Sequence, residues 1–280
     1  MKNILVPVDF SKDSINALKH AIAIANKLKA SLRILHVRKN KNYDSPFVIE
    51  GKENEYAKTV VEFCDNLVST YKPKYKGKGT FDYLIRVGKI YKIITEQAEL
   101  DNASLIVMGT HGVSGFEELW LGSNSFRVVG KSPCPVITVR NGFKKDKISK
   151  IVLPIDANRE TRIKVPYTAD LAEAFNAEVH IISVRTTERA DIVKRLKNYA
   201  TQASDYLEKR NITVIRDDIK GSNLAEITYT YGVHHGADLI SIVSNQRGTP
   251  VNMPISTTAQ HMVNHSPIPV LSIHPDYKMA

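Results

Sequence analysis

The sequence predicts an α/β protein with two tandem domains, each a five-stranded parallel sheet flanked by helices. Two observations support this fold class. Short apolar strands alternate with helical patterns along the chain, and the order of segments in the first half returns in the second. The chain has 280 residues, so each copy has an ordinary domain size of roughly 140 residues. We place the domains at residues 1–142 and 148–277, on either side of a polar, lysine-rich link.

Three segments of the first half carry the repeat. They return in the same order: ILVPVD at 4–9 as IVLPID at 151–156, LIVM at 105–108 as LISI at 239–242, and SPCPVITV at 132–139 as SPIPVLSI at 266–273. Two copies of one domain is the simplest account of this order.

The first half reads as alternating strands and helices. A stripe at helical spacing (Ile15, Leu18, Ile22, Ala25 and Leu28) predicts the first helix, with Asp9 and Ser11 as candidates for its N-terminal cap. A second helix is expected from Glu53 to Thr70, a third after Gly88 and a fourth after Gly115. The expected strands lie near residues 3–8, 31–37, 80–86, 104–108 and 135–139.

The second half reads alike, with a long helix from about Glu188 to Lys209. Its expected strands lie near residues 150–155, 178–184, 212–218, 238–243 and 269–273. Strand–helix alternation implies parallel strands joined by right-handed crossovers, with helices on both faces of the sheet. In such sheets a ligand binds beyond the carboxyl ends of the strands, where the strand order reverses.

Composition narrows the class of protein. The longest apolar runs are strand-sized, which predicts no membrane span. The first residues lack a secretory signal, and the two cysteines, Cys64 and Cys134, fit neither a disulfide framework nor a metal site, so we expect a cytoplasmic protein. The formal net charge is +10, but the lysines are scattered and cluster in loops, which favours solvated loop charge over nucleic-acid binding.

The clearest chemical motif leaves the fourth strand of the first half and enters a helix. It runs GTHGVSG at residues 109–115 and ends in GSNS at 122–125. Glycines let the backbone turn and approach an anion closely, and main-chain N–H groups at a helix N-terminus suit phosphate oxygens. Many glycine-rich segments are simply tight turns, so glycine content alone is weak evidence for phosphate binding. The spacing of the glycines is the stronger evidence.

That spacing, with Gly109, Gly112 and then Gly122-Ser123, resembles the nucleotide-binding signature of the universal stress protein family. The opening ILVPVDFS at 4–11 and the last strand at 133–139 are also similar to the family pattern, and the resemblance covers the chain twice. It implies two Rossmann-like domains, with ATP or a related adenylate (ADP or AMP) bound above the first sheet.

The resemblance also implies roles for individual residues. Pro7, Val8 and Asp9 would line the adenine and ribose end, Val37 would contact adenine, and Met108 and Gly109 would border the ribose. The phosphates would lie against Gly112, Gly122, Ser123, Asn124 and Ser125, although the family often has a small or β-branched residue where Asn124 stands.

Two of these residues keep alternatives. Asp9 could accept hydrogen bonds from ribose or adenine, help to hold a magnesium ion beside the phosphates, or cap the helix that follows. His111 lies inside the glycine loop, where it could donate to a phosphate or remain an exposed loop side chain. The other histidines show no recognised metal spacing, so no metal site built from the protein alone is expected.

The second half departs from the motif. Val243, Gln246 and Ser256 stand where the first half has Gly109, Gly112 and Gly122. Side chains then occupy places where the backbone had to approach phosphate, so we expect no ATP there. Asp156 repeats the position of Asp9 and is expected to act only as a helix cap.

The sequence favours a nucleotide-binding regulatory module over an enzyme. It shows no base beside a nucleophile, no Walker lysine and no kinase-like catalytic loop. The alternative is slow ATP hydrolysis or self-phosphorylation on Ser114, Ser123 or Ser125. A third possibility is a purely structural tandem that acts through protein contacts. The last strand of each half would lie at a sheet edge, and exposed edges tend to be paired. The family resemblance implies dimerisation through this strand, so we expect the two halves to pair there as an internal pseudo-dimer, with further homo-oligomerisation left open.

Overall fold

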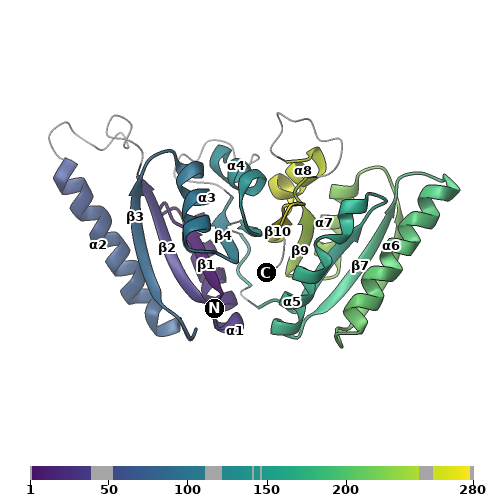
Figure 1. Cartoon of the computed structure of the whole chain (residues 1–280), viewed down its shortest axis with the longest axis horizontal. Helices are drawn as coiled ribbons and strands as arrows, with labels where there is room; N and C mark the ends of the chain where they lie inside the picture. The colour runs from purple at the N-terminus through teal and green to yellow at the C-terminus, as the bar shows by residue number, and fades with distance from the viewer. Residues whose placement is uncertain are drawn as a thin grey trace.

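The protein is described from a computed structural model that covers residues 2–38, 53–110, 122–140, 142–145, 147–245 and 255–277. Its strands form one ten-stranded sheet in the order β3-β2-β1-β4-β5-β10-β9-β6-β7-β8. All neighbours within each half are parallel, and the halves join where β5 and β10 pair antiparallel. Figure 1 shows the two halves side by side, with α2 and α6 at the outer flanks.

The first half contains five strands and four helices within the described residues. In chain order they are β1 (Asn3–Pro7), α1 (Lys12–Leu28), β2 (Ser31–Arg38), α2 (Glu53–Tyr71) with a 3-10 turn η1 (Lys72–Lys74), β3 (Phe81–Val87), α3 (Ile90–Leu100), β4 (Leu105–Gly109), α4 (Ser123–Lys131) and β5 (Val136–Val139). The strands confirm the sequence prediction to within one or two residues. The helix expected after Gly115 is described only from Ser123 onward.

The second half repeats this order. Its elements are β6 (Lys150–Ile155), a 3-10 turn η2 (Arg159–Arg162), α5 (Val165–Phe175), β7 (Glu178–Arg185), α6 (Ala190–Glu208), β8 (Val214–Lys220), α7 (Leu224–His234), β9 (Leu239–Val243), α8 (Thr257–His265) and β10 (Val270–Ile273). The five expected strands are all present, although β8 lies two residues later than the sequence predicts.

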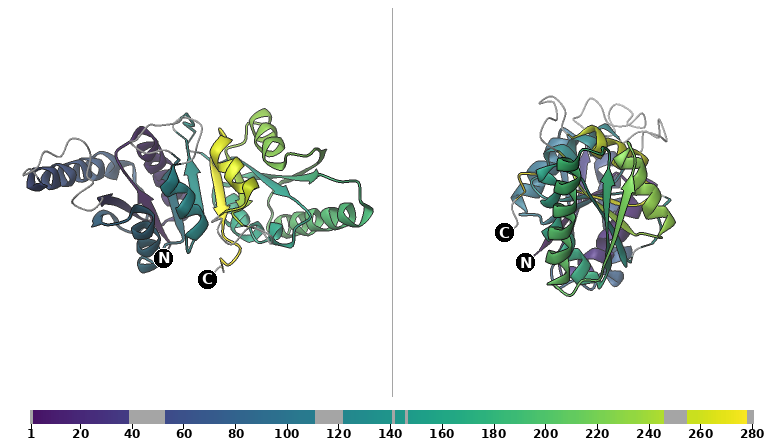
Figure 2. Two further views of the ribbon diagram at one scale, coloured as in Figure 1. Left: turned by 90° about the horizontal axis from the view of Figure 1, so that it is seen from above. Right: turned by 90° about the vertical axis from the view of Figure 1, so that its right-hand side faces the viewer.

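Alternation along the strands divides the core into two layers. In β1, Ile4 and Val6 face the layer that holds α1, α2, α5 and α6, whereas Leu5 faces the layer that holds α3, α4, α7 and α8. Successive side chains of a strand point to opposite faces, so each central strand is apolar on both sides, as a sheet covered by helices requires. Seen from above in Figure 2, helices lie on both sides of the sheet.

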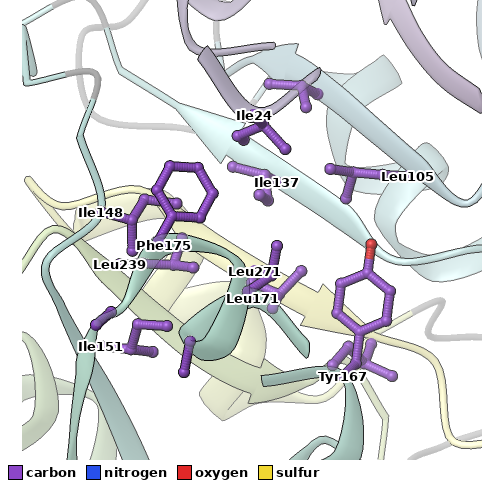
Figure 3. Packing of buried hydrophobic residues seen from close by; sticks show 14 of the residues in the cluster. Ile24, Leu105, Ile137, Ile148, Ile151, Tyr167, Leu171, Phe175, Leu239 and Leu271 are labelled. Carbon is purple, nitrogen blue, oxygen red and sulfur yellow. The ribbon is translucent and has the colours of Figure 1, made fainter. Parts of the chain in front are cut away.

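One of the two layers continues across the junction between the halves. Figure 3 shows Ile24, Leu105 and Ile137 of the first half packed with Leu171 and Leu271 of the second. Beside them, the Tyr167 hydroxyl of α5 donates to the Ser104 carbonyl oxygen at 2.9 Å. The expected pairing of the last strands is therefore reinforced by a shared core. None of the helices in the described part of the chain is long and apolar enough to cross a bilayer.

Candidate functional site

The strand order of the first half reverses at β1, which has β2 on one side and β4 on the other. The chain therefore leaves the sheet in opposite directions from neighbouring strands, which opens a crevice at their carboxyl ends. Pro7 ends β1, Val37 is the next-to-last residue of β2, and Met108 and Gly109 end β4. Five predicted site residues thus meet at this edge once Val8, next in the chain, is included.

The turn after β1 is held by both main-chain and side-chain hydrogen bonds. The Val8 amide donates to the Leu35 carbonyl at 2.9 Å, and the Val8 carbonyl oxygen lies 2.8 Å from Nδ1 of the buried His36. Phe10 takes a left-handed conformation with φ of 64°, which is uncommon for a bulky residue. Its ring stacks on that of His36 at a centroid distance of 4.7 Å. This packing holds the turn that carries Asp9 just after the carboxyl end of β1.

Asp9 is not the helix cap. Its Oδ1 accepts from the Ser11 amide at 3.1 Å and from the Ser11 hydroxyl at 2.6 Å, which closes a tight turn before the helix begins. Ser11 is the N-cap of α1, because its hydroxyl oxygen accepts from the Ser14 amide at 3.2 Å. Of the two candidates, the structure therefore selects Ser11, and Asp9 is held half-buried beside the crevice.

Gly109 is explained in part by packing. A Cβ atom at this position would lie 2.8 Å from the carbonyl carbon of Asp13 and 3.0 Å from the Ser14 nitrogen. The first turn of α1 therefore rests directly on the end of β4, and only glycine leaves room for it. The sequence argument assigned this glycine to close approach of a ligand, and the structure adds a second reason for it.

The other end of the motif begins α4. Gly122 is the N-cap of this helix and supplies no side-chain hydrogen bond, while its own amide donates to the Thr110 carbonyl at 2.9 Å. Ser123 is exposed and Asn124 is half-buried. The first amides of a helix have no partner within it, and no side chain among the described residues caps those of α4, which lie near the end of β4.

Ser125 is placed differently from the other predicted phosphate contacts. It is buried, and its hydroxyl donates to the Gly109 carbonyl oxygen at 3.1 Å. This bond ties α4 to the end of β4. Because its hydroxyl hydrogen is used in this bond, Ser125 links the start of the motif at Gly109 to its end in α4. His111 and Gly112 lie outside the described residues, as does Ser114.

The sequence argument missed two polar residues at this edge. The Thr110 hydroxyl donates to Asp13 Oδ2 at 3.3 Å, which links the residue after β4 to the first turn of α1. In the sequence, Asp13 is visible only as an acidic residue in the first turn of a helix, and the helix dipole favours such residues there in any helix. A local preference of this kind does not identify its distant partner. Within the described part of the chain, no three histidine, cysteine or acidic residues lie together as metal ligands.

The second half keeps the turn that follows the first strand but has different side chains around it. The Asp156 amide donates to the Thr161 hydroxyl at 3.3 Å, just as the Asp9 amide donates to the Ser14 hydroxyl at 3.3 Å. Asp156 Oδ1 accepts from the Asn158 amide at 2.8 Å, so it closes a turn and is not the expected helix cap.

The helix that follows in this half carries its own cap. Ser256 is the N-cap of α8, and its hydroxyl oxygen accepts from the Ala259 amide at 3.2 Å. The Ser256 side chain therefore accepts from an α8 amide whose counterpart in α4 has no side-chain cap from its own N-cap residue. Val243 stands at the end of β9 in place of Gly109, and Gln246 lies outside the described residues.

Known proteins resemble this chain over both halves. The model of the universal stress protein family matches residues 1–140 and 147–274. A Staphylococcus aureus (strain USA300) protein, whose name places it among the universal stress proteins, is 33% identical over 142 residues, which are 50% of this chain and 84% of that protein.

Solved structures resemble the complete two-half arrangement. A universal stress protein from Archaeoglobus fulgidus DSM 4304 aligns over 98% of each chain with a TM-score of 0.73 and 20% identity. A functionally unknown protein from Pseudomonas aeruginosa PAO1 aligns over 99% of this chain and 93% of that chain, with a TM-score of 0.69 and 16% identity. These identities support a shared fold and nothing further. Because the family model covers both halves, the protein belongs to the universal stress protein family as a tandem member.

Proposed function

We propose that the first half binds ATP or a related adenine nucleotide and that the protein acts as a stress-response binding module. The observation that carries this proposal is the uncapped N-terminus of α4 beside the point where the strand order reverses. Gly122 offers no side chain there, whereas the corresponding Ser256 caps α8. A nucleotide suits the first site because its phosphates can accept from amides that no side chain among the described residues caps.

The phosphates would lie against the first turn of α4. The amides of Ser123, Asn124 and Ser125 point out of the helix, and the positive end of the helix dipole favours negative charge at the same place. The exposed Ser123 hydroxyl adds a donor. Ser125 would act through its amide, because its hydroxyl is bound to Gly109. Gly112 and His111 are proposed to complete this cradle from the preceding loop.

The adenine and ribose would lie at the ends of β1, β2 and β4. Val8 and Val37 would flank the base, Pro7 and Met108 would border the sugar, and Asp9 would accept hydrogen bonds from hydroxyl or amino groups. Asp9 is also the carboxylate that a magnesium ion arriving with the phosphates would meet.

The test replaces one residue of the first half by its counterpart. Gly122→Ser gives α4 the cap that α8 has, and the second half shows that this backbone geometry accepts serine, since the Ser256 amide donates to Ser244 at 2.9 Å. The variant should fold normally and bind ATP about ten- to hundredfold more weakly in calorimetry, because a charge-assisted main-chain bond contributes about 1.5–3 kcal/mol. Ser256→Gly is the matched control and should leave ATP affinity unchanged. Equal ATP affinity in Gly122→Ser and the wild type would contradict the proposed site.

Hydrolysis is tested in the same samples. A binding module should retain uncleaved ATP after prolonged incubation with magnesium. Steady phosphate release, or phosphate found on Ser123, would favour the enzymatic alternative if Gly122→Ser abolished it. Ser125 is a poor acceptor for self-phosphorylation because its hydroxyl is buried and already bonded.

A further inference from the structure

The second half contains a buried amine that the nucleotide proposal does not use. Lys164 is 3% exposed and is the one lysine that is buried among the described residues. It occupies the N-cap position of α5 without making a side-chain capping bond, and its Nζ donates to the Thr161 hydroxyl at 3.0 Å. The corresponding residue of the first half is Ala17 in α1, which is completely buried. A charged side chain is costly at such a place, so it calls for an explanation.

Lys164 lines a small cavity at the position that corresponds to the nucleotide site of the first half. Its lining includes Pro154, Asp156, Ile242, Val243, Ser256 and Thr258, the counterparts of Pro7, Asp9, Met108, Gly109, Gly122 and Asn124. The cavity volume is about 20 Å³. Since one water needs about 10–15 Å³, the space suits only a small molecule.

The surroundings shift the protonation equilibrium of this amine toward its neutral form. Burial lowers the pKa of Lys164 to about 8, against an opposing attraction from Asp156. Asp156 is the only charged side chain that lines the cavity with Lys164 in the described structure. The other walls come from β6, α7, β9 and the N-terminal part of α8 with its N-cap, and they are apolar or hydroxyl-bearing. A neutral lysine amine is a nucleophile, so an appreciable fraction of Lys164 can react near neutral pH.

We propose that Lys164 is a reversible carbamylation site that takes up carbon dioxide. The Nζ lone pair forms a bond to the carbon of CO₂, one C–O π pair moves onto oxygen, and one N–H proton leaves to solvent. The product is a carbamate anion on Nζ. No oxidation or reduction occurs, and CO₂ is the only co-reactant. It is a small, uncharged molecule, which suits a small cavity with largely apolar walls.

Hydroxyl groups around the cavity can hold the product. The Thr161 oxygen already accepts from Lys164 Nζ and from the Asp156 amide, which leaves its own hydrogen to donate. The Ser256 hydroxyl oxygen accepts from the Ala259 amide, so its own hydrogen is likewise left to donate. The N-terminus of α8 adds a favourable potential for an anion. Asp156 opposes the new negative charge, so it limits the occupancy.

The experiment uses the full chain with ¹³C-labelled bicarbonate at pH 8, followed by ¹³C NMR. The wild type should show a carbamate resonance that disappears in Lys164→Met and persists in Lys150→Met, a lysine paired with Glu178 at the surface. The α-amino group of the chain also forms a carbamate near this pH, which gives every variant an internal positive control.

Two further variants separate a carbamate from a purely structural lysine. Asp156→Asn should raise the carbamate signal several-fold, because it removes both the attraction that keeps the amine protonated and the repulsion of the product. Thr161→Val should reduce the signal. The proposal is overturned if the wild type shows only the α-amino resonance, or if the second resonance survives Lys164→Met. Neither result depends on nucleotide binding in the first half.

Discussion

The two halves share one framework and differ at the carboxyl ends of their strands. In the first half, α1 runs from Lys12 to Leu28 and its first turn rests on Gly109. In the second half, a 3-10 turn (Arg159–Arg162) replaces the first turns, and α5 begins only at Val165. Both helices end at corresponding positions with a left-handed residue, Lys29 or Asn176. The difference is therefore confined to the end that faces the site.

A single substitution accounts for much of this difference. The first turn of α1 can pack on β4 because residue 109 has no side chain. Val243 brings branched bulk to the same place, and the chain above it takes a different path. The second half then fills its crevice with Val243, Lys164 and the Ser256 cap. The comparison indicates that a few side chains at strand ends change this edge of the molecule while the order of the strands is unchanged.

The largest expected effect comes from making the first half like the second at residue 109. Gly109→Val should lower ATP affinity at least about a hundredfold, because a Cβ placed 2.8 Å from the Asp13 carbonyl carbon must displace the turn that positions Asp9. Overpacking should also cost about 1–3 kcal/mol of unfolding free energy. Calorimetry and urea unfolding measure the two effects. Gly142→Val is the control, since a Cβ there meets no atom within 4 Å. Unchanged ATP affinity in Gly109→Val would break the comparison.

A smaller effect is expected from removing the buried amine. Because the folded pKa of Lys164, about 8, lies below its ordinary value of 10.5, the unfolded chain binds more protons between these pH values. Stability from this group therefore rises as pH increases from about 8 towards 10.5 and is lowest below pH 8. Lys164→Met should raise the unfolding free energy at pH 7 by about 1–3 kcal/mol and flatten the rise between pH 8 and 9.5.

Urea unfolding of wild type and Lys164→Met across that pH range measures this difference directly. Met fills a similar volume, so the variant keeps the packing of α5 against the sheet. If the wild type and the variant had the same unfolding free energy at every pH, burial of the Lys164 amine would carry no energetic cost.

The smallest effect concerns the cap of α8. Ser256→Ala removes the acceptor of the Ala259 amide and should cost about 1 kcal/mol of unfolding free energy. It should leave ATP affinity unchanged, because the second half is proposed to hold no nucleotide. A drop in ATP affinity would instead indicate that the second half takes part in binding.

Much of the framework follows from the sequence. Short apolar runs locate the ten strands of the described structure, and the edge position of the last strands, together with the family resemblance, predicts the pairing of β5 with β10. These features depend on periodicity and on general rules of sheet topology, which are legible in one chain. The family resemblance similarly directs attention to Gly109 and Gly122, which the structure connects through Thr110 and Ser125.

Details of the site depend on contacts between distant residues. Asp9 and Ser11 are both good caps by residue type, and only the backbone path selects Ser11. Periodicity places Ala17 and Lys164 alike in the helix after the first strand, and nothing local shows that the amine of Lys164 turns inward to Thr161. The packing of Asp13 against Gly109 joins residues far apart in sequence, so it too lies beyond a local pattern.

The most direct test of the central claim compares the amides at the two helix N-termini. In ¹H–¹⁵N spectra of the full chain, ATP should shift the resonances of Ser123, Asn124 and Ser125, while those of Thr257, Thr258 and Ala259 stay in place. Shifts confined to the α8 amides, or no shift in α4 at saturating ATP, would contradict the account.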